Sequence, residues 1–223
     1  MDTPKKYQFG DLRLRLLKTA SEILSEKGLK KLTMRSLSNK VGVSRTAPYR
    51  HFENKDALLL AIAEKGFNEL TIRYKKINCD KSLDSLSKLQ NIALAYIEFA
   101  IINPGPFRLM FGQEIIQHQR SEKLCSDARA TFNEYLIAVK ALQDEKNITT
   151  VDYSVLANYF WTIVHGLAIL LIDGQVQIIG ENCGLPTLLN DEKANIRGDI
   201  QSMIAFSKQT IMSFWDVKFN GIL

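Results

Sequence analysis

The sequence of 223 residues is poor in the side chains that build disulfide frameworks, metal centres and catalytic sites. It has three cysteines, which are widely spaced and form no CxxC pair, and only three histidines. This pattern argues against a disulfide framework or a structural zinc site, and it indicates a reducing compartment. The sequence also has no Gly-rich phosphate loop and no Ser-His-Asp or Cys-His arrangement. We therefore expect no enzyme, no metal and no cofactor.

The N-terminal residues also lack the apolar run of a secretory signal, so we expect a cytoplasmic protein. One stretch, residues 153–172, is long and apolar enough to be considered as a membrane span. It contains four polar side chains that would be costly in lipid, namely Ser154, Asn158, Thr162 and His165. A helix in the middle of a helical bundle is equally apolar, and we favour this buried helix over a membrane span.

Positive charge is concentrated in the first quarter of the chain. Residues 1–55 carry 13 Lys and Arg against 5 Asp and Glu, whereas the remaining residues carry 16 against 19. A basic segment on a nearly neutral body suggests that the N-terminal part meets a polyanion while the rest has another role.

Helical periodicity begins with residues 11–27. Asp11 is placed to cap this helix, and Gly28 follows its last turn, where a left-handed residue is expected. Apolar residues at three- and four-residue spacing predict the buried stripe, which comprises Leu14, Leu16, Leu17, Ala20, Ile23 and Leu24.

Two short helices joined by a turn are predicted next. Thr33 is an N-cap candidate for a helix over residues 34–41, and Gly42 ends that helix in a tight turn. Ser44 is the next N-cap candidate, and Pro48 lies near the start of the following helix, where proline is tolerated. Two helices joined by a short turn that contains glycine form the helix-turn-helix pattern.

The second of these helices has a polar and basic face with one aromatic side chain. We expect Tyr49 and Phe52 to anchor it on one side. In a helix-turn-helix the second helix enters the major groove by its N-terminal end, so Arg45 and Thr46 are placed to reach base edges. The helix N-termini capped by Thr33 and Ser44 offer free N–H groups to phosphate. Further phosphate contacts are expected from Thr33, Tyr49, His51 and Lys55.

Four motifs resemble the N-terminal domain of TetR-family transcriptional regulators: Thr33-Met34-Arg35-Ser36-Leu37, Val41-Gly42-Val43-Ser44, Tyr49-Arg50-His51-Phe52 and Asn54-Lys55-Asp56-Ala57-Leu58-Leu59. The chain departs from the family at Thr46-Ala47-Pro48, where many members have Gly-Thr-Leu. The resemblance implies that DNA-contacting positions are occupied by Arg35, Arg45, Thr46, Ala47, Tyr49, Arg50, His51 and Lys55.

The rest of the chain is predicted to be helical as well, which gives an all-α fold. We expect a helix-turn-helix domain over residues 1–56, a connecting helix over 57–78 and a larger regulatory and dimerisation domain over 79–223. Asn103-Pro104-Gly105-Pro106 ends a helix over 83–102. Further helices are expected over 121–142, 151–172 and 191–219.

The last helix has an apolar stripe that is suited to packing against a partner. Paired with residues 151–172 from each of two chains, residues 191–219 would form the intersubunit four-helix bundle that the resemblance implies. Two-fold symmetry then places two reading helices about one DNA turn apart, which matches a palindromic operator.

The segment Trp161-Thr162-Ile163-Val164-His165-Gly166, with residues 47–52 and 107–112, resembles a TetR subgroup named for a WHG motif. Trp161 and His165 lie one turn apart on one helix face. We favour His165 as a satisfied core residue, with a ligand-site wall as the alternative and a metal site disfavoured. The candidate ligand-binding residues are Phe99, Phe107, Met110, Phe111, Trp161 and His165.

These features predict a dimeric transcriptional regulator that binds double-stranded DNA. The expected form is a repressor that a small apolar or aromatic effector releases from its operator. The alternative is a DNA-binding architectural or chromosome-associated protein without a ligand response, which would share every N-terminal feature.

Overall fold

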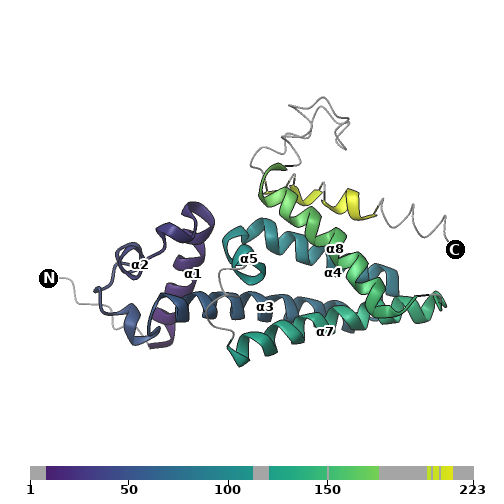
Figure 1. Ribbon diagram of the computed structural model, residues 1–223, viewed down its shortest axis with the longest axis horizontal. Helices are drawn as coiled ribbons and strands as arrows, with labels where there is room; N and C mark the ends of the chain where they lie inside the picture. The colour runs from purple at the N-terminus through teal and green to yellow at the C-terminus, as the bar shows by residue number, and fades with distance from the viewer. Residues whose placement is uncertain are drawn as a thin grey trace. The chain divides into compact units, whose positions relative to one another are not determined.

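The computed structural model describes residues 9–112, 121–149, 151–175, 200–201, 203–205 and 207–212. All regular structure in these residues is helical and none of them lies in a β-strand, so the predicted all-α fold is confirmed (Figure 1). The elements are α1 (Phe9–Lys27), η1 (Leu29–Lys31), α2 (Met34–Val41), η2 (Pro48–Arg50), α3 (Lys55–Cys79), α4 (Ser85–Ile102), α5 (Pro104–Phe111), α7 (Glu122–Glu145) and α8 (Tyr153–Ile172).

The predicted last helix, residues 191–219, falls largely outside the described residues. Within it, residues 200–201, 203–205 and 207–212 are helical. The residues between α8 and that helix are described only as far as residue 175.

The described residues form two compact units. The first comprises those of Met1–Asn68 and Asn103–Ala128, and the second comprises those of Glu69–Ile102 and Arg129–Leu223. Helices α3 and α7 each contribute residues to both units. Helix α5 therefore belongs with the N-terminal helices, although it follows α4 in the chain.

The first unit is built on α1, whose stripe is narrower than the periodicity predicts. Leu16, Leu17, Ala20, Ile23 and Leu24 are buried, but Leu14 is 61% exposed and was wrongly assigned to the core. The helix also begins at Phe9, so Asp11 lies within its first turn and is not the N-cap. A strict three-residue spacing falls short of one 3.6-residue turn, so Leu14, three residues before Leu17, lies beside the buried face rather than on it.

Helix α5 packs closely on α1 within the first unit. A Cβ atom at Gly105 would lie 2.6 Å from both the carbonyl carbon and the Cβ of Leu24, so only glycine fits this crossing. The N–H of Gly105 donates to Oγ of Ser25 at 3.2 Å. Pro104 occupies the first turn of α5, where the missing N–H costs nothing.

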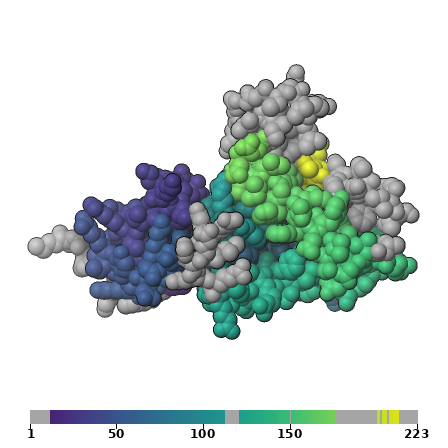
Figure 2. All heavy atoms as spheres, in the orientation of Figure 1, coloured from purple at the N-terminus to yellow at the C-terminus, as the bar shows by residue number. Residues whose placement is uncertain are grey.

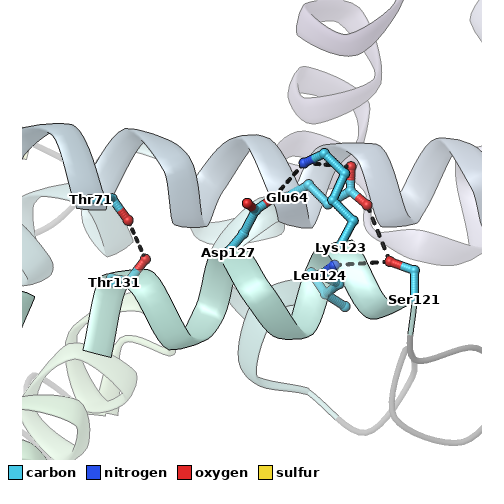
Figure 3. A network of polar contacts seen from close by, with 7 residues as sticks. All are labelled: Glu64, Thr71, Ser121, Lys123, Leu124, Asp127 and Thr131. Atoms are coloured by element: carbon cyan, nitrogen blue, oxygen red, sulfur yellow. Dashed lines mark hydrogen bonds and ion pairs between the residues drawn. The ribbon is translucent and has the colours of Figure 1, made fainter. Parts of the chain in front are cut away.

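Polar contacts join α3 to α7 in each unit (Figure 3). In the first unit, Lys123 Nζ lies 3.3 Å from Glu64 Oε2 and 2.6 Å from Asp127 Oδ2. Oγ of Ser121 donates to Glu64 at 3.3 Å and accepts the N–H of Leu124 at 3.0 Å, which caps α7. In the second unit, the buried hydroxyls of Thr71 and Thr131 lie 2.7 Å apart.

The second unit is centred on the packing of α4 against α8. Helix α4 is buried along most of its length, including Leu89, Ile92, Tyr96, Ile97 and Phe99. Helix α8 is capped by Asp152, whose carboxylate accepts the N–H of Ser154 at 2.8 Å.

Only one face of α8 is buried, which differs from the prediction of a helix enclosed on all sides. The buried residues are Ala157, Phe160, Val164, Ala168 and Leu171. Its exposed apolar residues are Tyr153, Val155, Tyr159, Trp161 and Leu170, and its atoms, green in Figure 2, reach the molecular surface. Of the helices described, α8 is the one with the length and composition of a membrane span. Hydropathy alone does not distinguish an enclosed helix from one with an uncovered apolar face.

Candidate nucleic-acid interface and ligand site

The N-terminus of α2 is fixed by a reciprocal pair of hydrogen bonds. Oγ1 of Thr33 accepts the N–H of Ser36 at 3.0 Å, and Oγ of Ser36 accepts the N–H of Thr33 at 2.9 Å. The predicted N-cap is therefore confirmed as a capping box. Thr33 and Arg35 are exposed at this end of the helix. The first turn of α2 consequently points its remaining N–H groups and one arginine outward.

The turn after α2 depends on Gly42. Its φ of 77° is the left-handed conformation that glycine adopts without strain, as predicted. The N–H groups of Gly42 and Val43 both donate to the carbonyl of Ser38 at 3.0 Å, which closes the end of the helix.

The reading segment, residues 44–51, is not the α-helix that the sequence predicts. It consists of a turn followed by the short 3₁₀ helix η2 at Pro48–Arg50. Pro48 has no N–H, so the Ser44 carbonyl accepts from the N–H of Ala47 instead, at 3.0 Å. Oγ of Ser44 lies 3.2 Å from Oγ1 of Thr46, and the cap of η2 is Ala47 rather than Ser44.

Some side chains of the reading segment and of the residue after it are buried and anchor the segment, while others are exposed. Pro48 and Phe52 are buried, while Tyr49 is 54% exposed, so the predicted anchoring role of Tyr49 was wrong. The exposed residues are Ser44, Arg45, Thr46, Tyr49 and Arg50, whereas Ala47 and His51 are half-buried. Arg45 and Arg50 thus stand in solvent beside three hydroxyl-bearing side chains.

A further cation lies beside this segment that the sequence analysis did not single out. The guanidinium of Arg13, on α1, stacks on the ring of Phe52 at 5.3 Å from its centroid. Arg13 is itself exposed. The two residues are far apart in the chain, so no local pattern predicts their contact.

Lys55 is the first residue of α3, and its side chain links this helix to the segment between α1 and α2. Its Nζ donates to the carbonyl of Leu29 at 3.0 Å. The neighbouring Lys30 and Lys31 are exposed. Asn54 caps this helix, because its Oδ1 accepts the N–H of Ala57 at 2.9 Å. The helix N-terminus and three lysines therefore give a second cationic edge to the first unit.

The candidate ligand-binding residues fall into two groups, one in each unit. In the first unit, Phe107 and Met110 are buried, and Phe111 is half-buried. The ring of Phe111 lies 5.0 Å from that of Phe107 and 5.5 Å from that of Phe67. Phe67, on α3, was not among the predicted residues.

The second group lies between α4 and α8 in the second unit. The phenol oxygen of Tyr96 lies 2.7 Å from Nδ1 of His165, and the rings of Trp161 and His165 are 5.2 Å apart. Phe99, one turn along α4, is buried. His165 is half-buried, and burial lowers its pKa because the imidazolium loses hydration. Tyr96 is the partner of His165 that the sequence analysis missed, since it lies on another helix.

Neither unit presents a metal centre in the parts of the chain that the structure describes. No group of three or more His, Cys, Asp or Glu side chains there is placed to hold a metal ion.

Two family models match the sequence in its two halves. Residues 16–62 match the model described as bacterial regulatory proteins, tetR family. Residues 89–183 match the tetracyclin repressor-like C-terminal domain. The first match covers the helix-turn-helix, and the second covers most of α4 and all of α5, α7 and α8.

Similar proteins of known sequence include the nucleoid occlusion factor SlmA. The SlmA of Aliivibrio fischeri (strain MJ11) is 28% identical over 163 residues, which is 70% of this chain and 80% of that protein. The SlmA of Haemophilus ducreyi is 34% identical over 102 residues, or 45% of this chain and 49% of that protein.

Solved structures show the same fold. A protein of unknown function from Rhodococcus sp. RHA1 superposes with a TM-score of 0.68 at 24% identity, covering 94% of this chain and 98% of its own. The TetR-family transcriptional regulator PfmR of Thermus thermophilus gives a TM-score of 0.61 at 15% identity, with 95% of both chains covered. Because matches to two TetR domains together span more than half of the sequence, the chain belongs to the tetR family of bacterial regulatory proteins and is a DNA-binding regulator.

Proposed function

We propose that this regulator is a repressor that binds a palindromic operator as a homodimer and is released by a small apolar or aromatic effector. The observation that carries the DNA-binding half is the reading segment. There, buried Pro48 and Phe52 hold Arg45, Thr46, Tyr49 and Arg50 out into solvent. Exposed arginine and hydroxyl groups on a short rigid element are the groups that contact base edges and phosphates.

The roles within this interface follow from position. Arg45 and Thr46 read base edges, because both are exposed and directly precede η2. Thr33, Arg35 and Ser44 hold phosphates near the N-terminus of α2 and the start of the turn. The remaining contacts come from Ala47, Tyr49, Arg50, His51 and Lys55.

The dimer is supported by the uncovered apolar face of α8. Val155, Tyr159 and Leu170 are 57%, 48% and 41% exposed, on a helix without a single Asp, Glu, Lys or Arg. Such a face is costly in water, and a second copy of α8, with residues 191–219, would cover it. The symmetric pair would carry two reading segments about 34–36 Å apart, matching two half-sites.

The effector response is supported by the two groups of aromatic residues described above. Phe107, Met110 and Phe111 form one group, and Phe99, Trp161 and His165 with Tyr96 form the other. The Trp161–Gly166 segment also fits the WHG subgroup that the sequence resembles. Groups of aromatic side chains with few charged residues beside them favour an apolar or aromatic effector.

A second candidate function is that of a chromosome-associated DNA-binding protein without a ligand response. The similarity to nucleoid occlusion factors favours it. The first unit would have the same role in both cases, so the candidates differ in where the protein binds and in what binding does.

Mapping the DNA bound by the protein in cells, together with transcripts from a deletion strain, separates them. A repressor gives few sites, each with inverted half-sites, and transcription of the adjacent genes rises on deletion. Many dispersed sites with unchanged adjacent transcripts would instead support the chromosome-associated function. If the bound DNA sites contain no inverted repeat, the proposed dimer is contradicted for both candidate functions.

A further inference from the structure

The guanidinium of Arg13, on α1, is held beside the C-terminal end of the reading segment by the ring of Phe52. Its Cζ atom lies over that ring, 5.3 Å from the centroid. Phe52 is the residue after the reading segment, is only 4% exposed, and donates its N–H to the carbonyl of Pro48 at 3.0 Å. The ring is therefore tied to η2, and its contact with Arg13 places a cation of α1 next to the reading segment.

The hydrogen-bonding groups of Arg13 are available to a ligand. A guanidinium has five N–H donors, and a contact with a phenylalanine ring satisfies none of them with a lone pair. No carboxylate or carbonyl among the residues that the structure describes accepts a hydrogen bond from Arg13, and its side chain is exposed. Arg13 is thus a positioned cation whose charge the described fold does not neutralise.

Arg15, two residues later on the same helix, has a different role. Its Nη2 donates to the carbonyl of Val41 at 3.1 Å, and its side chain is half-buried, so it ties α1 to the end of α2. Arg13 makes no comparable bond to the part of the fold that is described. The structural need for a cation on this part of α1 is met by Arg15, which leaves the charge of Arg13 for another purpose.

A backbone phosphate of DNA is the anion that fits this position. Phe52 follows the exposed Arg50 by two residues, so Arg13 and Arg50 both lie near the same end of the reading segment. DNA that is bound by the reading segment presents phosphates on either side of the contacted bases. A guanidinium can bind such a phosphate through two parallel hydrogen bonds. Because the ring restricts the side chain before DNA arrives, less conformational entropy is lost on binding.

We propose that Arg13 is a further DNA-contacting residue, which binds a backbone phosphate beside the bases contacted by the reading segment, and that Phe52 is its positioning residue. The contact carries no base preference, because every nucleotide presents the same phosphate group. This inference rests on the proposed interface at the reading segment and extends that interface to α1.

The salt dependence of DNA binding tests this contact on the full-length protein. The probe is a labelled duplex of random sequence, and fluorescence anisotropy at several salt concentrations gives the slope of the logarithm of affinity against that of salt concentration. For Arg13→Ala we expect binding about three- to tenfold weaker at low salt, and a slope smaller by about 0.9 for each protomer bound. A residue that only stabilises the fold would change the unfolding midpoint and leave the slope unaltered, and that result would overturn the inference.

Lys18→Ala is the matched control. Lys18 is also an exposed cation on α1, but it lies five residues after Arg13 and so about 140° around the helix. The variant removes the same charge from the same helix and should leave the slope nearly unchanged. An equal loss of slope in Lys18→Ala would show that only the net charge matters, and it would overturn the phosphate contact of Arg13.

Phe52→Leu tests the positioning role, because leucine keeps the site apolar but has no ring face. The unfolding midpoint shows whether this variant is folded. In the Phe52→Leu background, adding Arg13→Ala should weaken binding by less than about twofold, since the guanidinium is no longer held in place. If Arg13→Ala has the same effect with and without the ring, Phe52 does not position the arginine and that role is wrong.

Lys55→Ala separates this inference from the wider proposal. If Lys55→Ala reduces the salt slope and Arg13→Ala does not, the proposed interface is supported and Arg13 is not part of it. If neither variant reduces the slope, the interface proposed for the first unit is wrong as well.

Discussion

The hydroxyl of Tyr96 and Nδ1 of His165 lie 2.7 Å apart and join α4 to α8 across the second unit. Sixty-nine residues separate them in the sequence. Either atom can be the donor of this bond, depending on the tautomer of the imidazole. Burial favours the neutral imidazole, since it lowers the pKa of His165.

This relationship predicts how stability depends on pH. Near and below pH 6.5 the unfolded chain takes up a proton on His165 that the folded protein resists, so stability is full above about pH 6.5 and falls below it. Unfolding midpoints measured between pH 8 and pH 5 should fall more for the wild type than for His165→Asn. Asparagine keeps an acceptor near Nδ1 but does not titrate.

Among the described residues, the carboxylates with lowered pKa values titrate below this window. Hydrogen bonds from Ser87 and Ser154 lower the pKa values of Asp84 and of Asp152, the cap of α8. Their contribution is lost only as the pH falls below about 4. If the unfolding midpoints of the wild type and His165→Asn fall equally with pH, the pKa of His165 is not lowered in the folded protein.

In the reading segment, Arg45→Ala should weaken operator binding by about 1–3 kcal/mol and relax the preference at one base position. The side chain is exposed and makes no contact that the fold needs, so the unfolding midpoint should not change. Lys55→Ala should instead weaken binding to all sequences and reduce the salt slope by about 1. Gel shifts with operator and scrambled DNA at several salt concentrations distinguish the two. If Arg45→Ala keeps the base preference of the wild type, a residue other than Arg45 reads the base edges.

The features of the candidate DNA-binding surface that could be predicted are those that depend on residues close together in the sequence. Thr33 and Gly42 were assigned correctly because a cap and a left-handed turn involve residues a few positions apart. The helix expected after Ser44 was wrong, although its cause, the missing N–H of Pro48, is visible in the sequence. The contact of Arg13 with Phe52 depends on the tertiary fold, and no spacing rule predicts it.

The same limit applies to the second unit and to α5. The sequence identifies Trp161 and His165 as neighbours on one helix, but it does not indicate that Tyr96 is their partner. Pro104 and Gly105 were recognised as a helix stop. Gly105 also lies where α5 packs closely on α1. This contact joins residues 80 positions apart in the chain, so the sequence does not indicate it.

The crossing of α5 over α1 predicts a marked loss of stability in Gly105→Ala. The new methyl group would lie 2.6 Å from backbone atoms of Leu24 and Ser25, which cannot rotate away. Overpacking of this kind costs about 1–3 kcal/mol. Ser25→Ala is the control, because it removes only the acceptor of the Gly105 N–H and should cost about 0.5–1.5 kcal/mol. Urea unfolding compares them, and an equal or smaller loss in Gly105→Ala would show that the helices cross less closely.

The exposed face of α8 predicts the oligomeric state. Leu170 is 41% exposed there, and Leu170→Glu would bury a carboxylate in the proposed dimer, where it has no partner. Sedimentation at micromolar concentration should show a dimer for the wild type and a monomer for the variant. Leu14→Glu is the matched control, because Leu14 is 61% exposed on α1 in the other unit. It should remain dimeric, since a carboxylate at that position stays in water. A wild-type monomer, or a dimeric Leu170→Glu protein, would remove this face of α8 from the interface and require another arrangement for the two reading segments.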